Sequence, residues 1–171
     1  MPLSRRLRFD PDKGLEIILY VSNRIACKDL YWVLKAPYFA DKYNLAGAAR
    51  PVSGDTYTAM KDGPVPSGLY DLVKDVRDKR VKSPNYDKAQ RVFRVECNRI
   101  IPHRDADLSF LSKTEIESLD RAITEIGPLS FDTLKRRSHD DAYESADPNG
   151  DMSLEAIVRT LPDAELILDA A

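Results

Sequence analysis

The chain has 171 residues, 43% of them hydrophobic and 32% charged, which suits one folded core and is too apolar for a disordered protein. Its net charge of −2 gives no overall attraction to nucleic acid or anionic lipid, and even its longest apolar runs, such as residues 30–34, are far too short for a membrane span. Because no apolar run of signal-peptide length follows the N-terminal arginines, we expect a soluble cytoplasmic protein with a single domain over residues 1–171.

The first part of the chain predicts two helices. Apolar residues between Leu15 and Ala26 recur at helical spacing behind Pro11, which favours a first helix there. Asp29 is placed to cap a second helix that reaches Leu45. Pro37 lies inside this second helix, where it removes a backbone hydrogen bond, so we expect a kink.

A short β-type run comes next. Residues 53–55 have turn chemistry and lead into the run 56–60, which residues 61–66 should close with a sharp turn because they hold one glycine and two prolines. Ser67 is expected to cap a third helix. The basic residues 78–90 form the longest candidate loop.

The second half predicts a hairpin followed by more helices. Residues 91–96 and 99–103 flank Cys97-Asn98 and should form a β-hairpin. Ser112 and Glu115 have the spacing of a capping box, which starts a helix that Gly127 ends. Three further serines are expected to cap short helices: Ser130, Ser138 and Ser153. The elements together predict an α+β fold that is mainly α, a helical domain with a small antiparallel β-sheet or hairpin.

Charge is unevenly distributed along the chain. Residues 74–94, which we call the basic segment, carry eight Lys or Arg against three Asp. From residue 139 onward nine acidic residues stand against Arg159 alone. Such asymmetry is typical of partner surfaces, but it also fits solvated faces of one domain that attract each other weakly.

Residues that carry catalysis or bind metals are sparse. The glycines form no phosphate-binding loop, and a zinc site would require four widely spaced residues to converge: Cys27, Cys97, His103 and His139. Ser138, His139 and Asp140 have the residue types of a hydrolytic triad, but adjacent positions point in different directions, and Ser138 as a helix cap explains them more simply. We therefore expect no catalytic residue, no metal and no cofactor.

Two stretches of the chain resemble a known family. Residues 29–45 and 50–71 contain, in order, a set of short motifs: Tyr38-Phe39-Ala40-Asp41, Arg50-Pro51, Gly54-Asp55, Ala59-Met60-Lys61-Asp62-Gly63-Pro64-Val65-Pro66 and a helix bearing Tyr70. Their order and spacing are similar to those of the Panacea (SocA-like) antitoxin domain. A second match runs from Leu111 to Ile157, so the resemblance covers about residues 12–161. Three positions depart from the family pattern: Pro37 replaces a usual leucine, Ala49 a glycine and Tyr143 a common tryptophan.

The resemblance implies an antitoxin of a bacterial or phage toxin–antitoxin module that neutralises a co-encoded toxin by direct contact. A toxin protein is therefore the expected partner, and no membrane is. We expect its binding residues in the motif and in the basic segment: Tyr57, Met60, Lys61, Pro64, Pro66, Tyr70, Lys79, Arg80 and Lys82. The end of the chain, Leu166 to Ala171, resembles tags read by unfoldase–protease machines, which makes a protease a second candidate partner; the alternative is that Leu166, Ile167 and Leu168 dock on the body.

Two other functions stay open at this stage. The basic segment interleaves cations with Tyr86 and Phe93, which would suit a nucleic-acid-binding regulator, although the overall acidity and the lack of a recognition motif disfavour it. The third hypothesis is a hydrolase that uses Ser138 and His139.

Overall fold

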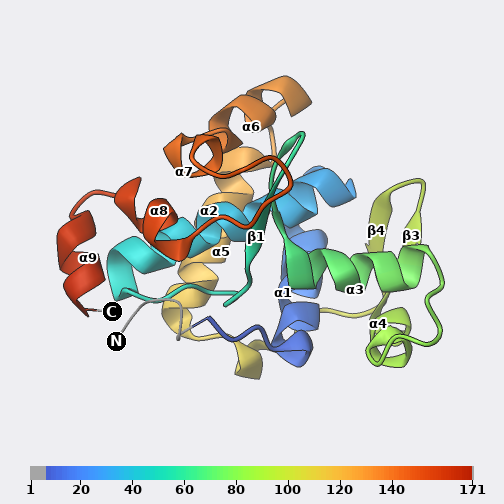
Figure 1. Ribbon diagram of the computed structural model, residues 1–171. Coiled ribbons are helices and arrows are strands. Elements are labelled where there is room, and N and C mark those ends of the chain that lie inside the picture. The colour runs from blue at the N-terminus through green and yellow to red at the C-terminus, as the bar shows by residue number, and fades with distance from the viewer. Residues whose placement is uncertain (1–6, 171) are drawn as a thin grey trace.

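The computed structural model describes residues 7–170 (Figure 1). Its helices are α1 Pro11–Arg24, α2 Leu30–Ala48, α3 Ser67–Arg77, α4 Tyr86–Val92, the 3₁₀ helix η2 Leu108–Phe110, α5 Lys113–Ile126, α6 Phe131–Ser138, α7 Asp141–Glu144, α8 Leu154–Arg159 and α9 Ala164–Ala170. Its strands form two antiparallel pairs, β1 Tyr57–Met60 with β2 Gly63–Pro66 and β3 Phe93–Glu96 with β4 Arg99–Pro102. The predicted fold class, α+β and mainly α, is confirmed.

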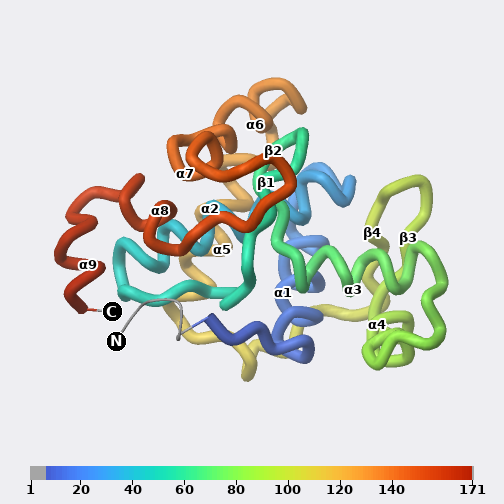
Figure 2. Tube along the Cα trace, viewed as in Figure 1, coloured from blue at the N-terminus to red at the C-terminus, as the bar shows by residue number. Residues whose placement is uncertain are grey.

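Helix α2 crosses the middle of the molecule, and α5 packs along it (Figure 2). It begins where Asp29 accepts a hydrogen bond from the backbone N–H of Tyr31, as the sequence predicts. The helix continues through Pro37 without ending there, and whether it bends stays a prediction. Its residues enter both hydrophobic clusters of the described chain, Val33 and Leu34 in the first and Tyr38 and Leu45 in the second.

The first hydrophobic cluster surrounds α1. Residues 14–22 of this helix are buried on every side, because α2, α3, α4, α5 and β4 all pack against it. Asp10 caps the helix, and Pro11 occupies its first turn, where a missing N–H costs nothing.

The second hydrophobic cluster joins α2 to the C-terminal helices and to strand β1. Ile167 of α9 is buried in it, whereas Leu166 is 70% exposed, so only part of the expected docking of the C-terminal aliphatic residues occurs. Ala171, which ends the proposed protease tag, lies outside the described residues.

Residues 61–66 differ from the prediction, because most of them form a strand. Only Lys61 and Asp62 make the turn, and β2 pairs back along β1 in the register Met60↔Gly63, Thr58↔Val65. In an antiparallel pair, only every second residue of a strand directs its backbone N–H toward the neighbouring strand. In this register Gly63 and Val65 hold those positions, so Pro64 and Pro66 lie where β1 needs no N–H donor. The opposite edge of β1 is covered by residues 149–152, with a hydrogen bond from Met152 N–H to the carbonyl of Tyr57.

Three other local predictions were wrong. Ser67 is the first residue of α3 and does not cap it; the carboxylate of Asp55 accepts the N–H bonds of Gly68 and Leu69 instead. The expected loop 78–90 ends early, because α4 begins at Tyr86. Ser138 is the last residue of α6, and Asp140 caps α7 in its place.

The other predicted caps and the hairpin are confirmed, except that residues 91 and 92, expected in the first strand of the hairpin, belong to α4. Ser112 and Glu115 form the reciprocal capping box of α5, and Ser130 and Ser153 cap α6 and α8. The hairpin β3–β4 turns at Cys97 and Asn98, both of which have positive φ. No helix within residues 7–170 is long and apolar enough to cross a membrane.

Candidate protein-binding site

The turn of the first hairpin is held from both sides. We call residues Met60 to Gly63 the tip. The hydroxyl of Tyr31 on α2 donates to the carbonyl of Asp62 at 2.8 Å, and the hydroxyl of Tyr143 on α7 donates to the carbonyl of Met60 at 2.7 Å. These two hydrogen bonds anchor the tip to two helices that are far apart in the sequence.

Gly63 lets the tip lie close to its neighbours. Its φ is +115°, a conformation that side-chain-bearing residues rarely adopt. A Cβ atom there would also collide with the hydroxyl of Ser138 and press on Cε of Lys35. The glycine of the family motif is therefore required for both reasons.

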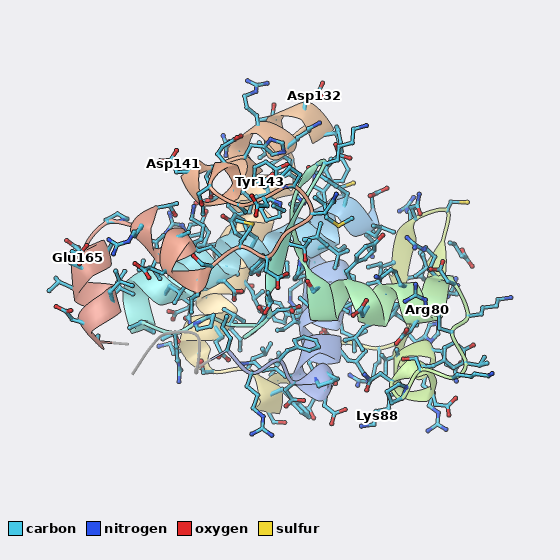
Figure 3. The ribbon with its side chains drawn as sticks, viewed as in Figure 1. Arg80, Lys88, Asp132, Asp141, Tyr143 and Glu165 are labelled. Carbon is cyan, nitrogen blue, oxygen red and sulfur yellow. The ribbon has the colours of Figure 1, made fainter. Side chains whose placement is uncertain are left out.

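Two hollows lie on either side of the tip, and Met60 and Lys61 border both. The first, which we call the Lys35 groove, has a volume of about 170 Å³ and is walled by α2, Val65 of β2 and Tyr70 of α3. The second, of about 520 Å³, lies between the tip and residues 143–149. The tip is thus a ridge between two hollows, close to α7 and to Tyr143 (Figure 3).

Lys35 is the unusual residue of the first hollow, because it is only 1% exposed. Its ammonium donates to the carbonyl of Pro64 at 2.7 Å and lies 4.6 Å from the ring centre of Tyr31. Burial lowers the pKa of Lys35 to about 7, although the nearby Asp62 opposes the shift. The carboxylate of Asp62 itself pairs with Lys135 at 3.0 Å.

Ser138 and His139 lie behind the tip but do not form a nucleophile–base pair. The hydroxyl of Ser138 donates to the carbonyl of Lys135 at 2.8 Å. The ring of His139 stacks on Tyr143 at 4.1 Å, and burial together with Lys135 lowers the pKa of His139. These contacts of Ser138 and His139 give no support to the hydrolase hypothesis.

Two aspartates of the family motifs support the hairpin from inside. Asp41 accepts hydrogen bonds from the backbone of Val52 and Ser53 and from the hydroxyls of Ser53 and Tyr57. Asp55 accepts from three backbone N–H groups, including the first turn of α3. Burial raises the pKa of both carboxyls, and these hydrogen bonds partly offset it. Their roles are structural.

The nine residues predicted to bind a partner separate into three groups. Met60, Lys61 and Tyr70 border the Lys35 groove. Three are buried residues of the hairpin that line neither hollow, namely Tyr57, Pro64 and Pro66. The last three lie in the exposed loop after α3, away from the tip, namely Lys79, Arg80 and Lys82.

Sequence reasoning missed Tyr31, Lys35 and Tyr143 as parts of the site. Nothing local distinguishes Tyr31 from a core aromatic residue of a helix, or Lys35 from a surface lysine. Tyr143 was noted only as a departure from the family pattern. The structure shows that Tyr143 holds the tip in place, because its hydroxyl donates a hydrogen bond to the carbonyl of Met60.

Within residues 7–170, no ion pair joins the basic segment to the acidic C-terminal third, and a weak attraction between the two faces stays a prediction. Cations of the basic segment pair with Asp12, Asp71, Asp78 and Glu96. Figure 3 shows Arg80 and Lys88 on one side of the molecule and Asp141 and Glu165 on the other. Within residues 7–170, no three His, Cys, Asp or Glu side chains gather as metal ligands would.

A comparison with protein families identifies the domain. The family model described as antitoxin SocA-like, Panacea domain, matches residues 33–144, which is more than half of the chain and includes the tip, Lys35 and Tyr143. Searches of curated proteins and of solved structures gave no match. The chain therefore belongs to the Panacea-domain family of SocA-like antitoxins.

Proposed function

We propose that this protein is the antitoxin of a toxin–antitoxin module and that it neutralises a co-encoded toxin by direct contact through the tip. Family membership supports an antitoxin-like, non-enzymatic role. The bacterial or phage origin and the cytoplasmic location belong to the same proposal.

The observation that carries the proposal is a rigid, exposed ridge. Met60 is 36% exposed although it is a large apolar residue, and its backbone is fixed by Tyr143. Lys61 beside it has no ion-pair partner among the described residues. A surface held in place before binding loses little conformational entropy when a partner docks.

The test is co-expression with the product of the adjacent gene. The wild-type protein should restore growth and co-purify with the toxin. Met60→Asp should weaken binding at least about tenfold, because it replaces the exposed apolar side chain of the proposed contact with a charge. Leu166→Asp is the matched control, since Leu166 is also exposed and lies on α9. Equal loss in both variants, or no complex with wild type, would contradict the proposal.

A second candidate function, nucleic-acid binding, rests on unpaired cations at the far end of α3. Lys79, Lys82, Arg91 and Arg99 have no ion-pair partner among residues 7–170. If this end binds a phosphate backbone, affinity for a labelled duplex should fall steeply with salt and with Lys79→Glu. Absence of binding at low salt would remove this candidate.

A further inference from the structure

The Lys35 groove has walls suited to an apolar side chain. Leu30, Leu34, Val65 and Tyr70 face it, and its volume is about 170 Å³. For comparison, an engineered apolar protein cavity of about 150 Å³ holds a benzene molecule. The groove is therefore large enough for one leucine-sized group.

Lys35 lines the same groove, and the hydrogen-bonding capacity of its buried amine is largely unused. An ammonium has three donors, and among the described residues Lys35 uses one, toward Pro64. The nearest carboxylate, Asp62, pairs with Lys135 instead. Lys61, Tyr70 and Tyr31 also line the groove and His139 lies near Lys35, but none of them forms a hydrogen bond with the amine of Lys35 among the described residues.

A carboxylate brought into the groove would satisfy Lys35. Charge-assisted hydrogen bonds are about twice as strong as neutral ones, and the attraction is greater where water is excluded. Lys61 at the rim has no ion-pair partner within residues 7–170 and would attract the same negative group. The charges and the apolar walls thus favour one class of ligand.

We propose that the Lys35 groove binds an apolar side chain of the toxin together with an adjacent carboxylate, and that this carboxylate pairs with Lys35. The identity of the partner rests on the proposed function, whereas the ligand chemistry does not. A segment with leucine or isoleucine beside aspartate or glutamate, or an apolar C-terminal residue, has this chemistry. Met60, exposed at the edge of the groove, extends the apolar contact beyond it.

The ligand chemistry is tested on the free protein with a small probe. The ¹³Cε resonance of Lys35 reports the protonation of its amine. Isocaproate, an apolar carboxylate, should raise the titration midpoint of Lys35 by one pH unit or more at saturation. Isocaproamide, of the same shape but neutral, should bind more weakly and leave the midpoint within a few tenths. If isocaproate does not shift the Lys35 resonance, the inference is wrong whatever the toxin does.

The partner arm uses the complex with the co-encoded toxin. Lys35→Met should reduce affinity at least tenfold, and Lys113→Met, an exposed control on α5, should not. One Asp→Asn or Glu→Gln substitution in the toxin should cost as much and add nothing to Lys35→Met. Absence of a complex with wild type refutes the proposed function, whereas a complex insensitive to Lys35→Met refutes this groove as the toxin site. Because Lys35 is buried, Lys61→Met at the rim provides a second variant that keeps the fold.

Discussion

At the scale of single residues, the backbone conformation of Ala49 explains why the family usually has glycine at this position. The family places glycine before Arg50-Pro51, and Ala49 ends α2 in the left-handed conformation with φ of +53°. Glycine is favoured at this position of a helix end, because it has no Cβ to clash. Alanine here carries backbone strain that the usual residue avoids.

Ala49→Gly should therefore stabilise the protein by about 0.5–1 kcal/mol. The measurement is the free energy of unfolding in urea. Ala46→Gly, at an exposed position inside the same helix, is the control and should destabilise by a similar amount. A destabilising Ala49→Gly would show that the left-handed end of α2 is not strained.

Lys35 makes stability depend on pH. Its pKa is about 7 in the folded protein and 10.5 in the unfolded chain, so between these values the unfolded chain binds the additional proton. The contribution of Lys35 to the free energy of unfolding should therefore rise as the pH increases from about 7 to 10.5, and it should be lowest below pH 7.

The wild-type protein should gain about 1.4 kcal/mol per pH unit relative to Lys35→Met between pH 7.5 and 9. Urea unfolding of both proteins at several pH values gives this difference, and titrations common to both cancel. A difference that stays constant over this range would mean that Lys35 remains charged in the folded protein.

At the scale of elements, the capping box of α5 also ties two helices together. Glu115 receives the N–H of Ser112 and, at 2.8 Å, the ammonium of Lys13 on α1. The Ser112 hydroxyl accepts from the N–H of Glu115 and from Arg50. One local motif thus orients α5 against α1.

Ser112→Ala should lower the free energy of unfolding by about 1 kcal/mol, because the first turn of α5 loses its side-chain acceptor. Thermal or urea unfolding measures the effect. Ser109→Ala, at an exposed serine in η2, is the control and should change stability little. Identical melting of both variants and wild type would mean that the cap is energetically silent.

At the scale of the whole molecule, α2 connects the two hydrophobic clusters. Its two ends bury side chains in different clusters, so neither cluster can lose α2 without exposing the other. We propose on this ground that residues 1–171 form one domain. Trp32 fluorescence and far-ultraviolet circular dichroism should then report one coincident unfolding transition. Two separated transitions would divide the chain into independent units.

Charge is also separated at this scale. The basic segment and the acidic C-terminal third lie apart, and Lys79 and Lys82 of the basic segment form no ion pair among residues 7–170, so these cations are available to another molecule. Toxin affinity should therefore fall as salt rises through the physiological range, mainly through slower association. Lys79→Glu/Lys82→Glu should reduce this salt dependence. Salt-independent affinity would show that the basic segment is only a solvated surface.

The sequence alone determined the features that depend on neighbours within a few residues. The caps at Asp29, Ser112 and Ser153 satisfy N–H groups two or three residues away, and the turn at Cys97-Asn98 joins strands that follow each other directly. Such interactions are visible in the order of residues. The order and spacing of the motifs likewise indicated the family.

Tertiary structure decided what depends on segments far apart in the chain. Asp55 caps α3 from 13 residues away, and this explains why Ser67 does not. Lys35 is buried against the hairpin, where its side chain lies close to Gly63 and its amine bonds the carbonyl of Pro64, and no local pattern distinguishes it from an exposed lysine. Burial and long-range hydrogen bonds are set by how distant segments pack, so the groove beside the tip could not be predicted from the order of residues.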